Sequence, residues 1–341
     1  MKKHFYILAS ILLSLITFKS KASHFVGSDI SYKCTSTPNV YTVTMKIYRD
    51  CSGIPLCPGC TTAIPNGTVA GCTTASSGFS TQVIGATAPY VGVNYGSFTL
   101  NIVSSSSGYD IIQLCNNVQT ICTNCNTRTA GTFSPGIEVY TYEGNVDLSS
   151  LPSTCCNVIL GANACCRNGA TTTIVPGSFQ ALCIVNKCQT SCNSAPIFTH
   201  DAIPLLCAGI DIVYNLGAMD PDGDSLSYAF GESYQGINSV VSYVPPFRRT
   251  NPFPYLNSPD SVATYPGGLR IDPITGDIMF RAVGVFVTFL VIEVTQWKLV
   301  SGVRVNVGIT RRDVQIQTNL CLPNKSPIIK VSPHTTFGLG L

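Results

Sequence analysis

The stretch VYTVTMKIY, residues 40–48, alternates apolar and polar side chains and is rich in β-branched and aromatic residues. This period of two residues predicts a β-strand with one buried face. Gly-, Pro- and Asn-rich segments separate further stretches of the same character, and no long helical periodicity interrupts them. These stretches are 137–142, 211–214, 239–244, 278–280, 284–294 and 302–309. We therefore predict an all-β protein built from two β-sandwich-like modules.

The first 22 residues have the features of a secretory signal peptide. Lys2 and Lys3 precede an apolar run over 5–18, and Ser20 and Ala22 place small residues at positions −3 and −1 of a cleavage site. The run is short for a membrane span, which needs about 20 residues. We expect export, a mature chain that begins at residue 23 and no membrane span after cleavage, with an uncleaved anchor as the alternative.

The charge balance changes once this leader is removed. The 341-residue chain carries a net charge of +3, but four of its 20 basic residues lie in the leader, which leaves 16 against 17 acidic ones. Only 11% of the residues are charged, whereas about 25% is typical of soluble domains. No cluster of basic residues is longer than two, so the sequence argues against nucleic acid as a partner.

The cysteines divide the mature chain into two regions. Of the 17 cysteines, 15 fall in 23–194 and only Cys207 and Cys321 fall in 195–321. We predict a cysteine-rich, loop-rich first module, a second module over 195–321, and a tail over 322–341 that is a linker or the start of a further module. Because Cys207 and Cys321 flank the second module, we predict that they pair.

The cysteines of the first module are either disulfide partners or metal ligands. Cys57-x-x-Cys60 and Cys122-x-x-Cys125 resemble half-sites for zinc, but the two pairs lie far apart in the chain. In an exported protein we favour disulfides. The adjacent pairs 155–156 and 165–166 are expected to bond outward to different partners. Because 17 is odd, one cysteine of this module stays free or pairs between chains.

An acidic loop in the second module is the sharpest local signal. Asp220, Asp222 and Asp224 alternate around a proline and a glycine, so their oxygens could converge on a hard cation such as Ca²⁺. No glutamate stands at the twelfth position, so the loop is not an EF-hand. The alternative is a tight turn in which the aspartates accept hydrogen bonds from their own backbone.

Motifs in this module resemble a known class of repeat. The order DPDGDSLSY (220–228), IDPITGDI (271–278) and a strand that begins at Gly284 resembles bacterial cadherin-like and Ig-like repeats. In those repeats the Asp-rich turn joins early strands and the D-P-x-T-G segment forms a later hairpin. The resemblance implies an Ig- or cadherin-like β-sandwich over 195–321.

The resemblance extends over nearly the whole mature chain. The N-terminal SHFVG (23–27) and YTVTMKIYRDC (41–51) are similar to the first module of gliding motility-associated, type IX-secreted surface proteins. The stretches 140–148, 165–168, 193–198, 214–218 and 312–316 fit the same family. The resemblance implies an adhesin-like protein at the outer cell surface. Such proteins usually continue into further repeats and a sorting domain, so without one the periplasm is the alternative location.

No catalytic constellation is evident. The mature chain has His24, His200 and His334, but no G-x-S-x-G, H-E-x-x-H or phosphate-binding glycine loop. Asp272 and Asp277 could form a carboxylate pair, although a turn explains them better.

We therefore expect a non-enzymatic surface or adhesin-type protein whose partners are cell-surface glycans or other surface proteins. A soluble carbohydrate-binding module, with Trp297 or Tyr243 stacking on sugars, is the first alternative. A secreted hydrolase that uses His200 is the second.

Overall fold

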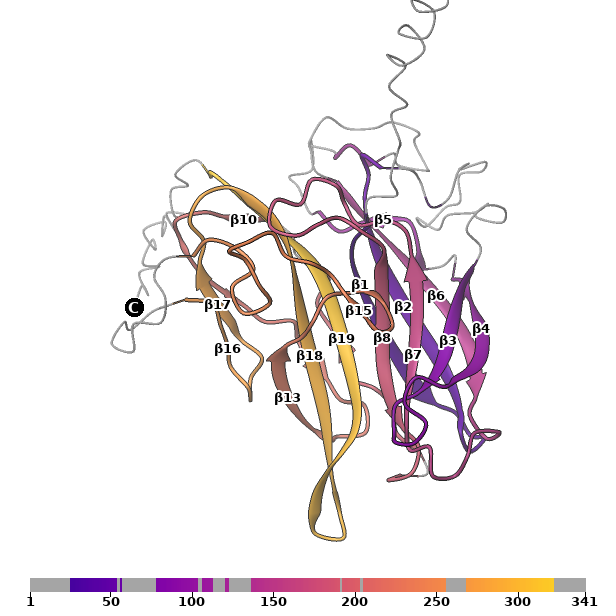
Figure 1. Ribbon diagram of the computed structural model, residues 1–341. Helices are drawn as coiled ribbons and strands as arrows, with labels where there is room; N and C mark the ends of the chain where they lie inside the picture. The colour runs from indigo at the N-terminus through magenta and orange to yellow at the C-terminus, as the bar shows by residue number, and fades with distance from the viewer. Residues whose placement is uncertain are drawn as a thin grey trace, which may run out of the picture.

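The computed structural model describes residues 25–53, 56, 78–103, 106–112, 120–122, 136–190, 192–202, 205–255 and 268–321 (Figure 1). These residues form β-strands and no α-helix, which confirms the all-β prediction. Among them there is no helix of the length and apolarity that a membrane crossing requires. The expected leader (1–22) and tail (322–341) lie outside the described residues.

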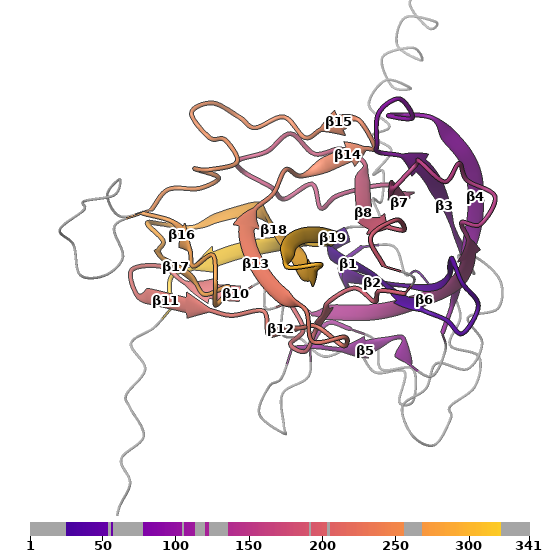
Figure 2. The same cartoon turned by 90° about the horizontal axis from the view of Figure 1, so that it is seen from below.

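Eight strands of the largest sheet form a closed circuit, which Figure 2 shows from one end. Each strand is antiparallel to its neighbours, and the last strand returns to the first because β19 pairs with both β8 and β1. In order around the circuit they are β1 (Phe25–Cys34), β2 (Val40–Asp50), β6 (Ile137–Asp147), β4 (Asn94–Ile102), β3 (Gly78–Gly85), β7 (Asn157–Ala164), β8 (Phe179–Asn186) and β19 (Val303–Asn319).

The long hairpin of β18 (Phe286–Val300) and β19 extends this sheet outward. β13 (Ser225–Phe230) pairs with β18, β10 (Leu205–Cys207) runs parallel to the end of β19, and β5 (Tyr109–Asp110) pairs with β6. Three small sheets complete the fold. They are β11 (Asp211–Tyr214) with β17 (Ile278–Arg281) and β16 (Arg270–Ile271), β12 (Ala218–Met219) with β9 (Ile197–Phe198), and β14 (Tyr234–Gly236) with β15 (Ser239–Val240).

Two hydrophobic cores lie on opposite faces of β2 and β6. Val43 and Tyr142 belong to the core inside the closed circuit, whereas Tyr48 and Val139 belong to a second core with Phe280. This division follows from the geometry of a β-strand, because successive side chains point to opposite faces.

Strands from both sides of the expected boundary at residue 194 share one sheet, because β19 pairs with both β1 and β8.

Five disulfides join the described cysteines, and Cys155 and Cys183 are free and buried. The outward pairing expected of adjacent cysteines occurs for Cys156, which bonds to Cys188, but it is wrong for Cys165 and Cys166, which bond to each other. The five pairs are Cys34–Cys192, Cys51–Cys122, Cys156–Cys188, Cys165–Cys166 and Cys207–Cys321. Cys57, Cys60 and Cys125, considered for zinc, lie outside the described residues.

The Cys207–Cys321 disulfide joins the end of β10 to the residue that follows β19 by two positions. Their Cα atoms are 5.4 Å apart and 114 residues apart in sequence. We predict that the C207S/C321S variant loses about 2–4 kcal/mol of unfolding free energy, because the cross-link closes a long loop in the unfolded chain. Urea unfolding measures the loss. The C156S/C188S variant opens a loop of only 32 residues and should lose less; an unchanged midpoint for C207S/C321S would contradict the prediction.

Candidate functional site

The acidic loop that sequence analysis singled out connects β12 to β13. The Oδ1 atom of Asp220 accepts hydrogen bonds from the backbone N–H groups of Asp222 (2.9 Å) and Asp224 (3.0 Å). Gly223 between them has a φ of +79°, a conformation that favours glycine. These are the hydrogen bonds expected if the loop is a tight turn. The Oδ1 atom of Asp220 therefore binds the backbone of its own loop.

The remaining oxygens of the loop anchor it to two distant segments. The Oδ2 atom of Asp222 accepts from the backbone N–H of Ser194 at 2.5 Å. The Oδ2 atom of Asp220 accepts from Nε2 of Gln296 at 2.6 Å, and the same nitrogen donates to the carbonyl of Ser194 at 2.6 Å. Gln296 lies on β18 and is fully buried. The loop is therefore a polar junction that ties the chain around residue 194 to the long hairpin.

Asp224 occupies a different environment from its two neighbours. Lys298 on β18 lies 3.4 Å from its Oδ1 atom, while its Oδ2 atom is buried without a hydrogen-bond partner. Burial raises the pKa of the Asp224 carboxyl above its ordinary value, and the Lys298 ammonium opposes that shift. Asp224 therefore favours its protonated form more than a solvated aspartate does.

The carboxylates of this loop do not converge on one point in the described structure. Among the described residues, Asp220, Asp222 and Asp224 do not form a group whose ligand atoms all lie within 4.8 Å of one another. Ca²⁺ requires six to eight oxygens, and four of the six carboxylate oxygens here already have partners. We predict that millimolar Ca²⁺ shifts the Tm by less than about 2 °C relative to chelator. Differential scanning fluorimetry measures this, and a larger rise would show that the loop rearranges around an ion.

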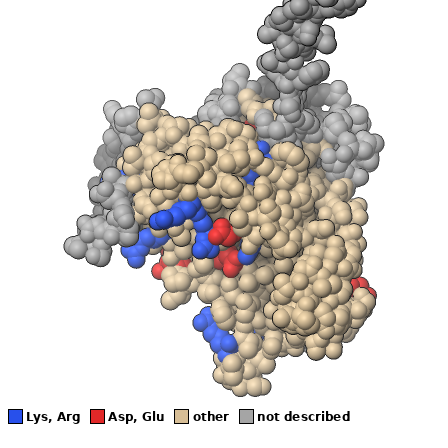
Figure 3. All heavy atoms as spheres, in the orientation of Figure 1, with Lys and Arg blue, Asp and Glu red and all other residues tan. Residues whose placement is uncertain are grey.

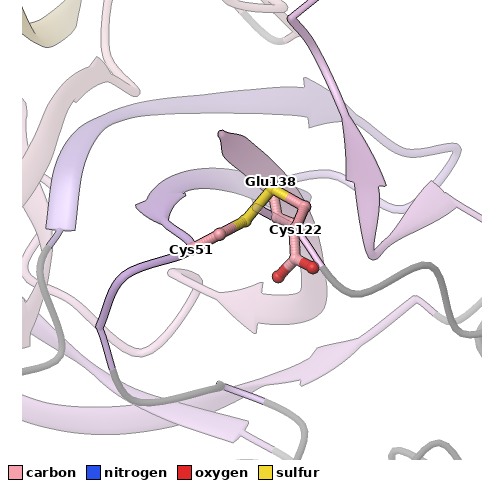
Figure 4. Close-up of side chains that lie close together, drawn as sticks. All are labelled: Cys51, Cys122 and Glu138. Atoms are coloured by element: carbon pink, nitrogen blue, oxygen red, sulfur yellow. A yellow bond between two sulfur atoms is a disulfide. The ribbon is translucent and has the colours of Figure 1, made fainter. Parts of the chain in front are cut away.

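One group of described residues has metal-ligand spacing, namely Cys51, Cys122 and Glu138. Figure 4 shows that the two sulfurs form a disulfide and that the Glu138 carboxylate lies beside it. Glu138 is already paired, since it accepts from Nη2 of Arg49 at 2.6 Å and from the Tyr140 hydroxyl at 2.9 Å. With both sulfurs bonded to each other, this group has no thiolate to offer a metal.

A network of ion pairs that the sequence analysis did not identify surrounds the buried Arg312 on β19. Arg312 donates from Nε and Nη2 to the two carboxylate oxygens of Asp29 on β1, and Tyr48 donates to the same carboxylate at 3.0 Å. The Arg312 side chain is fully buried. Burial alone would lower the pKa of Arg312, but the Asp29 carboxylate outweighs this and raises it. A buried arginine held by a bidentate carboxylate is a structural ion pair.

The residues on either side of Arg312 extend this network. Asp313 accepts from Arg167 at 2.7 Å, and the Arg167 guanidinium lies between the rings of Phe179 and Phe289. Arg311 pairs with Glu293 on β18 at 2.6 Å. A cavity of about 10 Å³ lies beside Arg311 and Asp313. This volume suits one water molecule and no larger ligand.

Of the residues considered for catalysis, Asp272 and Asp277 lie in one turn, where the backbone N–H of Asp272 donates to the carbonyl of Asp277 at 2.9 Å. His200 is exposed, and its backbone carbonyl accepts from Arg312 at 2.6 Å. Asp272 accepts from the N–H groups of Ile274 and Thr275, which lowers the pKa of its carboxyl, and it forms the turn between β16 and β17. His24 and His334 lie outside the described residues. The turn that Asp272 and Asp277 form therefore accounts for both aspartates, since Asp277 accepts from the Thr275 hydroxyl within it.

The two aromatic residues considered for sugar stacking are both engaged with protein groups. The Arg304 guanidinium lies 4.7 Å from the centre of the Trp297 ring, and the indole N–H donates to the Ser227 hydroxyl at 2.7 Å. Tyr243 packs against a small cluster of Ile174, Val241 and Phe289. Arg304 therefore occupies one face of the Trp297 ring, and Tyr243 is partly buried in the protein.

Comparison with known proteins found no match for this chain in any family, among curated proteins or among solved structures.

Proposed function

We propose that the chain is an exported, non-enzymatic structural or adhesin-type protein of a gliding bacterium, which contacts glycans or other surface proteins. The observation that carries this proposal is the surface. Most of the face in Figure 3 is uncharged. Several charged side chains lie in the interior instead, in the buried ion pairs of Arg312, Arg167 and Arg49. A surface of hydroxyl, amide and small apolar groups suits many weak contacts with polar, uncharged partners.

The disulfides support an extracytoplasmic location. Five of them join the described residues, and disulfides persist in oxidising compartments. Within this proposal, the second half of the chain corresponds to an Ig- or cadherin-like module. In support of it, the acidic loop joins the short strands β12 and β13, and the D-P-x-T-G segment forms the hairpin turn between β16 and β17. Placement on the outer surface, with the periplasm as the alternative, belongs to the same proposal.

Deletion of the gene from its source bacterium tests the adhesin proposal. We expect reduced cell attachment to glycan-coated and protein-coated surfaces, with growth unaffected. Complementation with the unsubstituted chain should restore attachment. Attachment that is unchanged on every surface would contradict the proposal. Saturable binding of the purified chain to one defined glycan would instead favour the carbohydrate-binding alternative.

A further inference from the structure

The end of the β18–β19 hairpin stands clear of the rest of the sheet. β13 pairs with β18 only as far as Trp297, and β8 pairs with β19 only at Gly308 and Ile309. Beyond these positions, residues 298–305 pair only with each other among the described strands. Figure 1 shows this hairpin end projecting from the lower edge of the molecule. We call residues 297–305 the hairpin tip.

The hairpin tip presents aliphatic side chains to solvent. Leu299 is 74% exposed and Val303 is 62% exposed. They flank a tight turn at Ser301 and Gly302, both of which are exposed and in the left-handed region. Leaving aliphatic side chains exposed at the end of a projecting element costs solvation free energy unless something covers them.

The charges of the hairpin tip are all positive. It contains Lys298 and Arg304 and no acidic residue. Lys298 is balanced by Asp224, whereas Arg304 has no ion-pair partner among the described residues and stacks on the Trp297 ring at 4.7 Å. In Figure 3 a group of basic atoms lies just above the uncharged end of this projection, with no acidic atoms beside it.

We propose that the hairpin tip inserts into an anionic lipid surface. The order of side chains along it fits the layers of a membrane interface, because aliphatic residues stand at the end and Trp297 stands at its base. Arg304 lies opposite Leu299, but its guanidinium reaches back over the Trp297 ring. Tryptophan and arginine settle at headgroup level, while leucine and valine enter the acyl region. Arg304 supplies the attraction to anionic headgroups.

The size and chemistry of the tip disfavour other partners. A stable protein interface involves about 20–30 residues from each partner, whereas the hairpin tip has nine. A sugar would need an open aromatic face, and Arg304 already occupies one face of the Trp297 ring. Lipid insertion does not depend on glycan contact, so it can fail while the proposed function stands, and the reverse also holds.

Trp297 is the only tryptophan of the chain, so its fluorescence reports on this site. The full chain, produced with its leader in an exporting host, is mixed with vesicles of phosphatidylcholine alone or with phosphatidylglycerol added. We expect a blue shift of Trp297 emission and cosedimentation with the phosphatidylglycerol vesicles. Quenching by brominated acyl chains places the ring at the interface. No binding to either vesicle would overturn the proposal.

Two double substitutions distinguish insertion of the hairpin tip from nonspecific adsorption of the protein to vesicles. The L299S/V303S variant should bind the anionic vesicles at least about tenfold more weakly, since two aliphatic side chains no longer insert. The matched control V285S/L320S changes side chains that are 60% and 79% exposed at the opposite end of the same two strands, and it should bind like the unsubstituted chain. Equal loss in both pairs, or undiminished binding of L299S/V303S, would overturn the proposal. Unchanged near-ultraviolet circular dichroism verifies that each variant is folded.

Discussion

Replacing Asp29 by alanine is expected to lower the free energy of unfolding by about 3–5 kcal/mol, because it leaves the fully buried guanidinium of Arg312 without a counter-charge. Asp29 also accepts from the Tyr48 hydroxyl, so the substitution removes a second hydrogen bond from the same interior site. Chemical denaturation of the D29A variant, compared with the unsubstituted chain, measures the loss.

A matched control comes from an exposed ion pair on another sheet. Arg281 on β17 and Asp211 on β11 are joined at 2.6 Å, but their side chains are 34% and 39% exposed. Solvent screens this pair, so D211A should cost less than about 1 kcal/mol. If D29A and D211A destabilise the protein equally, burial of the Arg312 pair does not determine its contribution.

A double-mutant cycle isolates the pair itself. The D29A/R312L variant should be more stable than the sum of the two single losses predicts, because neither charge is then left alone in the interior. Strictly additive losses would contradict the ion-pair account and would point to packing alone.

The strand pattern was predictable because it is local. The alternation in 40–48 reappears as β2, and 211–214 coincides with β11. The stretch 302–309, in contrast, covers only half of β19, which continues to Asn319. Three consecutive charges at Arg311, Arg312 and Asp313 interrupt the alternation there, and Arg312 and Asp313 are buried by partners far away in the sequence. Asp29 lies 283 residues from Arg312, and no spacing in one sequence indicates that contact.

At the candidate site, too, the local contacts could be predicted from the sequence and the long-range contacts could not. The turn formed by Asp220, Asp222 and Asp224 was predicted as one of two alternatives, since an aspartate that bonds to its own backbone is a local event. Its anchors, Ser194 and Gln296, were not foreseen, because they lie on other strands. The Cys207–Cys321 pairing could be proposed because the second region contains two cysteines. In the first region the possible pairings are too numerous for the sequence to select one.

Raising the pH above about 10 is expected to unfold the protein cooperatively, because burial makes its tyrosines ionise at higher pH in the folded chain than in the unfolded chain. Burial raises the pKa values of Tyr32, Tyr48, Tyr140 and Tyr142, and nearby carboxylates add to the shift at Tyr48 and Tyr140. Below pH 10 the folded and unfolded chains hold these four protons equally. Above it the unfolded chain releases them and the folded chain does not, so stability falls as the pH rises.

The expected size of this alkaline loss is large. Each retained proton lowers the free energy of unfolding by about 1.4 kcal/mol per pH unit, so four tyrosines together remove about 5.6 kcal/mol per pH unit once the pH is well above 10. This is comparable to the whole stability of many domains. Tyrosinate absorbance near 295 nm and far-ultraviolet circular dichroism should change together in one step. Ionisation of these tyrosines well below the pH of unfolding would contradict the account.

Two substitutions in neighbouring positions of β6 separate the proton effect from hydrogen bonding. The Tyr142 hydroxyl is buried without a partner, so Y142F should gain about 1 kcal/mol at pH 8 and lose about a quarter of the alkaline slope. The Tyr140 hydroxyl donates to Glu138 at 2.9 Å, so Y140F should lose the same share of the slope but be less stable than the unsubstituted chain at pH 8. If both variants keep the full slope, groups other than the buried tyrosines govern the alkaline transition.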